Sequence, residues 1–178
     1  KADKLFEGLV KKFSYSPAVW YNYAHFLYNI ISSPDRARAL LSRATQSLPP
    51  HTHINLTMKF AALEFNSDLG SPERGRTIVE GLLSTFPKRF DIWSQLLDLE
   101  LKQGNKDIIR GVFRRVTRSK ALKPKLAKSW FRKWSEWEDM NGNKKDSERV
   151  KMIAEDWVKA AALPMQQDDN LSAQKELL

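Results

Sequence analysis

Basic side chains gather between residues 88 and 133, where they could bind phosphate or carboxylate groups. This segment carries 14 Lys and Arg against 4 Asp and Glu, while the 178-residue chain has a net charge of +9. Arg110, Arg114 and Arg118 recur every four residues and so share one face of a predicted helix. Such a strip would bind a polyanion with steep salt dependence and little sequence readout, although a solvated helix face explains the same charges. The candidate partner-binding residues are Lys88, Arg89, Arg114, Arg115, Arg118, Lys120, Lys123, Lys125, Lys128, Arg132 and Lys133.

Aromatic residues alternate with basic ones in "SWFRKWSEWEDMNG", residues 129–142. This pattern is compatible with a platform on which RNA bases stack, and equally with the buried side of a helix. The two interpretations differ in whether the tryptophans face solvent. The register of these residues along the chain decides between them.

Other chemistry finds little support in the sequence. His51 and His53 lie two residues apart, but the chain has no cysteine and no acidic cluster beside them, so a metal site is not predicted. Neither a nucleophile–base–acid set nor a glycine-rich phosphate loop is present. No apolar run reaches the ~18 residues of a membrane span. We therefore expect no enzyme activity, no cofactor and no metal.

A repeat of 36 to 38 residues runs along the chain. The first positions of its stripe are Trp20, Thr57, Trp93 and Phe131, and apolar residues follow three and six positions later. At 100° per residue these positions lie on one face of a helix. The predicted repeat core is Trp20, Tyr23, Phe26, Phe60, Leu63, Trp93, Leu96, Leu99, Phe131, Trp134 and Trp137. The tryptophans of residues 129–142 share this register, so the core interpretation is favoured over the RNA platform.

A second helical motif follows each apolar stripe, as in "ARALLSRA" at 37–44 and "GRTIVEGL" at 75–82. Gly70, Gly104 and Gly142 are predicted to end first helices in the left-handed conformation. Each unit is thus a helical hairpin that must stack on its neighbours to bury its apolar face. We expect a single array over residues 1–164, an all-α right-handed α-solenoid of about nine helices.

The expected array has these parts. Residues 1–13 are an orphan second helix, which implies that another repeat precedes the chain in a longer protein. The repeats span 17–48, 52–86, 89–122 and 125–163. Pro164 should end the last helix. Residues 165–178 should form an acidic tail or a short capping helix.

The length of the repeat and its aromatic-rich first helices resemble the half-a-TPR (HAT) repeat of RNA-processing assemblies. This resemblance implies that a glutamate of the first helix pairs with a basic residue of the second helix within each hairpin. The implied pairs are Glu64 with Arg76, Glu100 with Arg110, and Glu138 with Lys151. The first repeat has Leu27 in the acidic position, so Arg38 would need another partner or would reach water.

Longer stretches resemble one family in particular. "KFAALEF" at 59–65, "STFPKRFDIWS" at 84–94 and "WFRKWSEWEDMNG" at 130–142 are similar to the C-terminal HAT-type repeats of the RRP-five family of eukaryotic rRNA biogenesis proteins. The resemblance implies a nucleolar scaffold of the small-subunit processome, acting in the early pre-rRNA cleavages that lead to 18S rRNA. It implies pre-ribosomal assembly proteins as partners, with pre-rRNA or small nucleolar RNA as further candidates. S1 RNA-binding domains are expected N-terminally in the parent protein.

Two other functions fit a helical-repeat chain. One is a HAT scaffold of splicing or mRNA 3′-end processing. The other is a TPR-like peptide-binding adaptor, which would need Lys and Asn residues that clamp a carboxylate in successive first helices. Aromatic or aliphatic residues occupy those positions here, which disfavours the adaptor.

Overall fold

The computed structural model is built of α-helices. It describes the backbone of residues 1–175 and the side chains of residues 1–162. Within residues 1–175 there are nine α-helices, one short 3-10 helix and no strand, which confirms the predicted all-α fold. The elements are α1 (Ala2–Lys12), α2 (Pro17–Asn29), α3 (Pro34–Ser47), η1 (Pro50–Thr52), α4 (His53–Asn66), α5 (Pro72–Thr85), α6 (Phe90–Gln103), α7 (Lys106–Thr117), α8 (Pro124–Asn141) and α9 (Lys144–Lys175).

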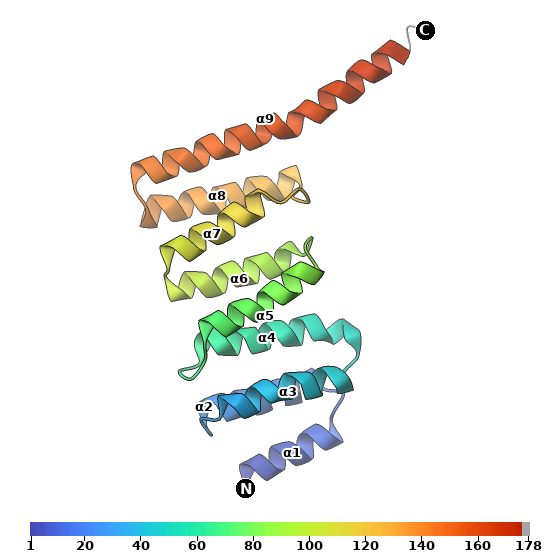
Figure 1. The fold of residues 1–178 in the computed structure, drawn as a ribbon, viewed down its shortest axis with the longest axis vertical. Coiled ribbons are helices and arrows are strands. Elements are labelled where there is room, and N and C mark those ends of the chain that lie inside the picture. The colour runs from blue at the N-terminus through green and yellow to red at the C-terminus, as the bar shows by residue number, and fades with distance from the viewer. Residues whose placement is uncertain (176–178) are drawn as a thin grey trace. The chain divides into compact units, whose positions relative to one another are not determined.

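The first compact unit spans Lys1–Gly104 and contains α1 to α6. Helices α2 and α3 form one hairpin and α4 and α5 form the next (Figure 1). The first helices α2, α4 and α6 contact one another in succession, and α3 also contacts α4. This unit therefore shows the stacking of helical hairpins that the repeat predicts.

The second compact unit begins at Asn105, and its described part contains α7, α8 and α9. Helix α8 packs against both α7 and α9. Contrary to the prediction, α9 does not end at Pro164 but continues to Lys175. A proline removes one backbone hydrogen bond, which a long helix can accommodate by bending. Residues 176–178 of the predicted tail lie outside the described residues, and the single array across both units stays a prediction.

Residues at the helix ends explain where the helices begin. Proline occupies the first turn of α2, α3, α5 and α8, where its missing N–H is not needed. The Ser71 hydroxyl accepts a hydrogen bond from the backbone N–H of Arg74. The Asn105 side chain likewise accepts from the N–H groups of Asp107 and Ile108. These caps satisfy donors that a helix leaves unpaired at its N-terminus.

The three turn glycines do not share one role. Gly104 has φ 76° and ends α6 in the left-handed conformation, as predicted. Gly142 has φ −99°, and Gly70 does not have a positive φ, so the left-handed prediction is wrong for both. A Cβ on Gly70 would collide with the Glu64 backbone, and one on Gly142 with the Glu138 side chain. Both turns need glycine because the chain folds back closely over a buried glutamate.

The predicted core residues are buried, with one exception. Trp20, Trp93 and Trp134 are 3%, 7% and 4% exposed. Phe26 is only partly buried, against the edge of the unit 1 core. In unit 2, the ring of Phe113 stacks on that of Trp134 with centroids 5.5 Å apart. The tryptophans of residues 129–142 are therefore core side chains and not an exposed stacking platform. The other predicted core residues that are buried are Tyr23, Phe60, Leu63, Leu96, Leu99, Phe131 and Trp137.

Candidate interaction surface

Three buried glutamates of first helices each accept two hydrogen bonds from an arginine. Arg38 bonds Glu64 at 2.7 and 3.0 Å, and Arg76 bonds Glu100 at 2.6 and 2.9 Å. The remaining pair lies in unit 2, and both its bonds measure 2.9 Å. We call the three pairs, Arg38–Glu64, Arg76–Glu100 and Arg110–Glu138, the Arg–Glu ladder.

The ladder corrects the predicted pairing. Glu64 was expected to pair with Arg76, Glu100 with Arg110, and Glu138 with Lys151; instead each glutamate pairs with the arginine of the preceding second helix. Each of these pairs joins two helices that pack together: α3 contacts α4, α5 contacts α6, and α7 contacts α8. Lys151 is exposed on α9. The bonds therefore join successive hairpins and not the two helices of one hairpin.

Hydrogen bonds keep two of these glutamates ionised. Burial acts to raise the pKa of Glu138, but hydrogen bonds from Arg110 and from Trp134 Nε1 outweigh it, so this pKa lies below its ordinary value. Burial also acts on Glu64, and the Arg38 guanidinium helps to hold the pKa of that carboxyl below its usual range. Each of the two carboxylates is already neutralised by an arginine, which suits a structural role.

The predicted basic residues are all exposed, but several already have partners. Arg89 in unit 1 forms hydrogen bonds of 2.8 and 2.7 Å with Asp91. In unit 2, Arg132 lies 3.8 Å from Glu136, and the Lys133 ammonium lies 5.9 Å from the Trp130 ring centroid. Arg115 of unit 2 is also exposed and likewise has an interaction partner. The other predicted residues are Lys88 in unit 1 and Arg114, Arg118, Lys120, Lys123, Lys125 and Lys128 in unit 2.

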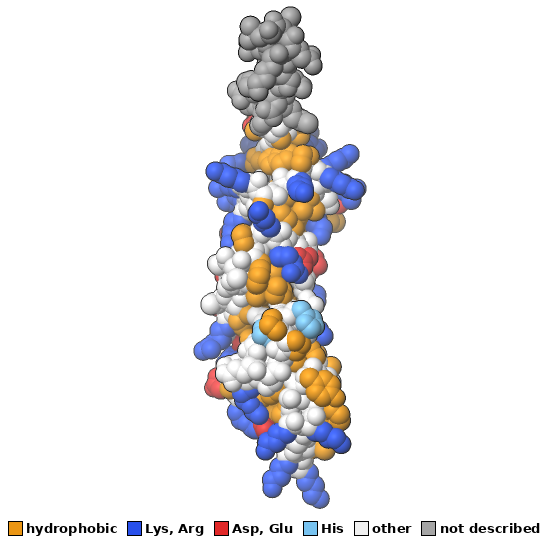
Figure 2. All heavy atoms as spheres, turned by 90° about the vertical axis from the view of Figure 1, so that its right-hand side faces the viewer, with side chains coloured by type: hydrophobic (Ala, Val, Ile, Leu, Met, Phe, Trp, Pro, Cys, Tyr) orange, Lys and Arg blue, Asp and Glu red, His pale blue; other side chains and the backbone are white. Residues whose placement is uncertain are grey.

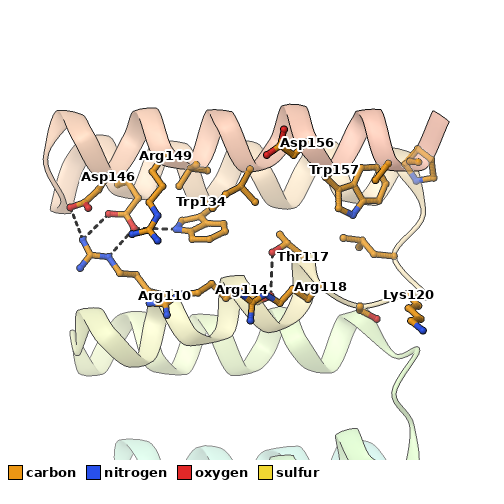
Figure 3. A pocket seen from close by; sticks show the side chains of 18 residues that line it. Arg110, Arg114, Thr117, Arg118, Lys120, Trp134, Asp146, Arg149, Asp156 and Trp157 are labelled. Carbon is orange, nitrogen blue, oxygen red and sulfur yellow. Dashed lines mark hydrogen bonds and ion pairs between the residues drawn. The ribbon is translucent and has the colours of Figure 1, made fainter. Parts of the chain in front are cut away.

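Three predicted residues of unit 2 come together at a groove. Arg114, Arg118 and Lys120 line an open cavity of about 1010 Å³ between α7 and α9. Figure 3 shows α7 along one side, α9 along the other and Trp134 of α8 between them. In the part of unit 2 that Figure 2 shows, Lys and Arg side chains flank exposed apolar ones. The other lining residues are Arg110, Thr117, Ser119, Leu122, Pro124, Glu138, Asp146, Arg149, Val150, Ile153, Asp156, Trp157, Ala160 and Ala161.

One end of the groove is closed by charge pairing. Arg110 bonds Glu138 and also Asp146, the latter at 3.1 Å. Its guanidinium lies 5.7 Å from the Trp137 ring centroid. Arg110 therefore already has structural partners, whereas Arg114 of the same helix and Arg118 at the C-cap of α7 face solvent. The sequence predicted that these three arginines share one helix face. In the structure, Arg110 has a structural role, whereas Arg114 and Arg118 are exposed.

Sequence reasoning missed the wall that α9 contributes. The motif "VKMIAEDW" at 150–157 was interpreted only as a second helix. In the structure its Ile153 and Trp157 line the groove, and Phe131 of α8 packs edge-on against Trp157 with centroids 6.2 Å apart. No signal in the sequence shows that this face of the helix stays partly uncovered.

The two histidines considered as a metal pair, His51 and His53, belong to unit 1. His51 is exposed, and the His53 ring Nε2 lies 2.8 Å from the Leu48 carbonyl oxygen. Among the described residues, no three or more His, Cys, Asp or Glu side chains are grouped as a metal would require. Every helix in the described part is too short or too polar to cross a membrane.

Comparisons with known proteins find relatives that carry the same name, RRP5. No protein-family model matches the chain. The "rRNA biogenesis protein rrp5" of Schizosaccharomyces pombe is 43% identical over 157 residues, which cover 88% of this chain and 9% of that protein. The "Protein RRP5 homolog" of Mus musculus is 36% identical over 90% of the chain. The "rRNA biogenesis protein RRP5" of Arabidopsis thaliana is 37% identical over 86% of it. The chain spans 8–9% of the length of these relatives.

Proposed function

Because the chain belongs to the RRP5 family of rRNA biogenesis proteins, we propose that it is a non-enzymatic scaffold in ribosome assembly. It would organise protein contacts within the small-subunit processome during the early pre-rRNA cleavages that lead to 18S rRNA. Its place of action would be the nucleolus. The observation that carries this proposal is the 43% identity to a named rRNA biogenesis protein over 88% of the chain.

The structure supports a scaffold in the way it uses its side chains. Most aromatic residues of the predicted repeat core are buried, and the three ladder glutamates are only 1–2% exposed and bonded to arginine. The aromatic side chains and the Arg–Glu pairs of the repeat thus hold the helices together. This arrangement leaves the outer surfaces of the hairpins to recognise other molecules. The names of the relatives refer to rRNA biogenesis, so we favour this role over splicing or mRNA 3′-end processing.

A test of the role uses the fission-yeast relative. Deleting the segment that matches residues 17–162 should reduce 18S rRNA and accumulate uncleaved precursor, while the large-subunit rRNAs change little. The measurement is blotting of pre-rRNA intermediates. The unaltered full-length relative, expressed at the same level, serves as the control. Normal 18S levels after the deletion would contradict the proposal.

RNA is a second candidate partner, favoured by the exposed lysines of the α7–α8 loop and α8. Lys123, Lys125 and Lys128 are exposed, and no acidic residue lies between them in the sequence. Replacing all three by Glu should weaken binding of a pre-rRNA fragment uniformly across sequences and flatten its dependence on salt. Fluorescence anisotropy at several salt concentrations measures this. An unchanged salt slope would exclude these lysines as phosphate contacts.

A further inference from the structure

The groove of unit 2 combines an apolar wall with charged edges, and its volume is at the upper end of the range for small-molecule sites. Its volume of about 1010 Å³ lies at the upper limit of the roughly 300–1,000 Å³ typical of small-molecule sites. Ile153, Trp157 and Ala161 of α9 line it and are only partly buried. Trp134 and Val150 form its buried interior. Covering such apolar surface is favourable, so the groove is suited to receive side chains from another polypeptide.

The α7 side of the groove carries unpaired positive charge. Arg114 and Arg118 are exposed, and in the described part of the chain neither guanidinium is in an ion pair. Lys120 continues this edge beyond the end of α7. Arg110, by contrast, already has two acidic partners at the closed end. The open edge therefore offers cations to a ligand that brings its own carboxylates.

We infer that this groove docks an amphipathic helical segment of a partner protein, with apolar side chains against α9 and acidic side chains against α7. The carboxylates would pair with Arg114, Arg118 and Lys120, and the apolar side chains would cover Ile153 and Trp157. Helix-in-groove binding of this kind needs anchors spaced three or four residues apart along the ligand. Both helices beside the groove, α7 and α9, are second helices. Binding there would therefore not need the carboxylate-clamping Lys and Asn residues that TPR adaptors carry on their first helices.

The lining favours protein over RNA. Asp156 is exposed on the α9 side, where its carboxylate would repel phosphate. Base stacking needs an open aromatic face. Trp134 is buried beneath Phe113, and Trp157 already has an edge-on aromatic neighbour. The α9 wall carries the exposed Arg149 as well as Asp156, whereas the cations Arg114, Arg118 and Lys120 lie together on the α7 side. A ligand whose acidic side chains lie mainly toward α7 therefore fits these walls better than a uniformly charged backbone does.

The test measures binding of a labelled synthetic peptide to the 178-residue chain. The peptide has about 15 residues, with Leu recurring every three or four positions and Glu on the opposite face. A scrambled peptide of equal composition lacks the apolar face, and a mixed-sequence single-stranded RNA is the second probe. The groove variant is Arg114→Glu with Arg118→Glu. The matched control, Lys125→Glu with Lys128→Glu, makes the same change of charge on α8, outside the groove lining. Ile153→Ser tests the apolar wall.

The expected result is binding of the amphipathic peptide and at least about tenfold weaker binding of the scrambled one. The groove variant should weaken binding by about tenfold or more, Ile153→Ser by several-fold, and the control by less than about twofold. Helical circular dichroism should be unchanged in every variant.

Several outcomes would overturn the inference. One is an equal loss in the groove variant and the control, and another is no binding of the peptide by the folded chain. RNA binding that the groove variant abolishes would assign the groove to RNA. Self-association through the groove, detected by sedimentation, would assign it to a second copy. The expectation that this partner is a pre-ribosomal protein rests on the proposed function, whereas the expected binding of the peptide does not. A failed peptide test with a positive deletion test would therefore reject the groove and leave the scaffold role standing.

Discussion

The Arg–Glu ladder shows how single residues can hold successive hairpins together. The glutamates are buried while the arginines keep side-chain exposures of 23–24%. A buried carboxylate is costly unless a well-placed cation and further hydrogen bonds compensate it. Ser71 N–H supplies such a bond to Glu64, and Trp134 supplies one to Glu138. Each glutamate thus joins a first helix to the second helix that precedes it.

The junction at the N-terminal end of unit 1 departs from this pattern. The position that is arginine in later second helices is Asp3 in α1, and the acidic position of α2 is Leu27. Asp3 accepts instead from Arg36 and from the Tyr23 hydroxyl, each at 2.9 Å. Burial, with the neighbouring carboxylates, raises the pKa of Tyr23. Both members of the expected pair are replaced together, so no buried charge is left without a partner.

Removing one member of a ladder pair should be strongly destabilising. Arg76→Met leaves the Glu100 carboxylate, 1% exposed, without its cation. The free energy of unfolding should fall by about 3–5 kcal/mol. Arg76→Met with Glu100→Leu should recover most of that loss, because no buried charge remains. Urea denaturation followed by circular dichroism measures both variants.

The control is Arg89→Met, which breaks an exposed pair with Asp91 and should change stability little. Equal losses for Arg76→Met and Arg89→Met would show that burial of the ladder glutamate does not matter.

At the scale of the elements, close helix packing depends on where small residues lie. Helices α4 and α5 form a hairpin in which Gly75 is buried, while Gly81 on the same helix is exposed. A Cβ at position 75 would lie 2.6 Å from the Phe65 ring and 3.1 Å from the Ala61 carbonyl oxygen. A Cβ at position 81 would meet nothing within 4 Å. Close packing of α5 on α4 therefore needs a glycine at position 75, whereas position 81 has room for a side chain.

Alanine at these two positions should act in opposite directions. Gly75→Ala should destabilise the chain by about 1–3 kcal/mol, because the Phe65 ring must move inside a packed core. Gly81→Ala should stabilise it by about 0.5–1 kcal/mol, because alanine favours the helix. Thermal melts of the two variants make the comparison. Stabilisation by both substitutions would mean that α4 and α5 pack less closely than described.

For the molecule as a whole, carboxylates bound to cations make stability depend on pH. The pKa values of Glu64, Glu138, Asp3 and Glu7 all lie below their ordinary values of 4.5 for Glu and 3.8 for Asp. A carboxyl with a lower pKa in the folded state adds stability above its unfolded pKa. That contribution is lost as the pH falls through the folded pKa.

The urea midpoint should therefore hold steady from pH 7 to about pH 5.5 and fall progressively below about pH 4.5. Glu138→Gln should lower the midpoint at pH 7 but reduce the further loss between about pH 5 and pH 3. Denaturation followed by circular dichroism at a series of pH values checks this. A midpoint that rises on acidification would contradict the proposed stabilisation by ionised carboxylates.

The basic residues were predictable only as a set. Sequence reasoning located the excess charge of residues 88–133, and the structure shows every predicted member exposed. It could not tell that Arg89 pairs with Asp91, or that Arg114 and Arg118 border an apolar groove. Those facts depend on which neighbours approach in space, and residue spacing along one helix carries no information about them.

The helices, their apolar faces and the buried tryptophans could be predicted from the sequence, because helical periodicity and capping are local properties of the chain. The pairing of each ladder glutamate with the preceding second helix, and the continuation of α9 beyond Pro164, became visible only in the folded chain. The partly uncovered face of α9 beside α7 is likewise a feature of the tertiary structure. The physical reason is that pairing and exposure are set by packing between helices. The same local pattern permits several packings, and the lowest free energy among them selects one.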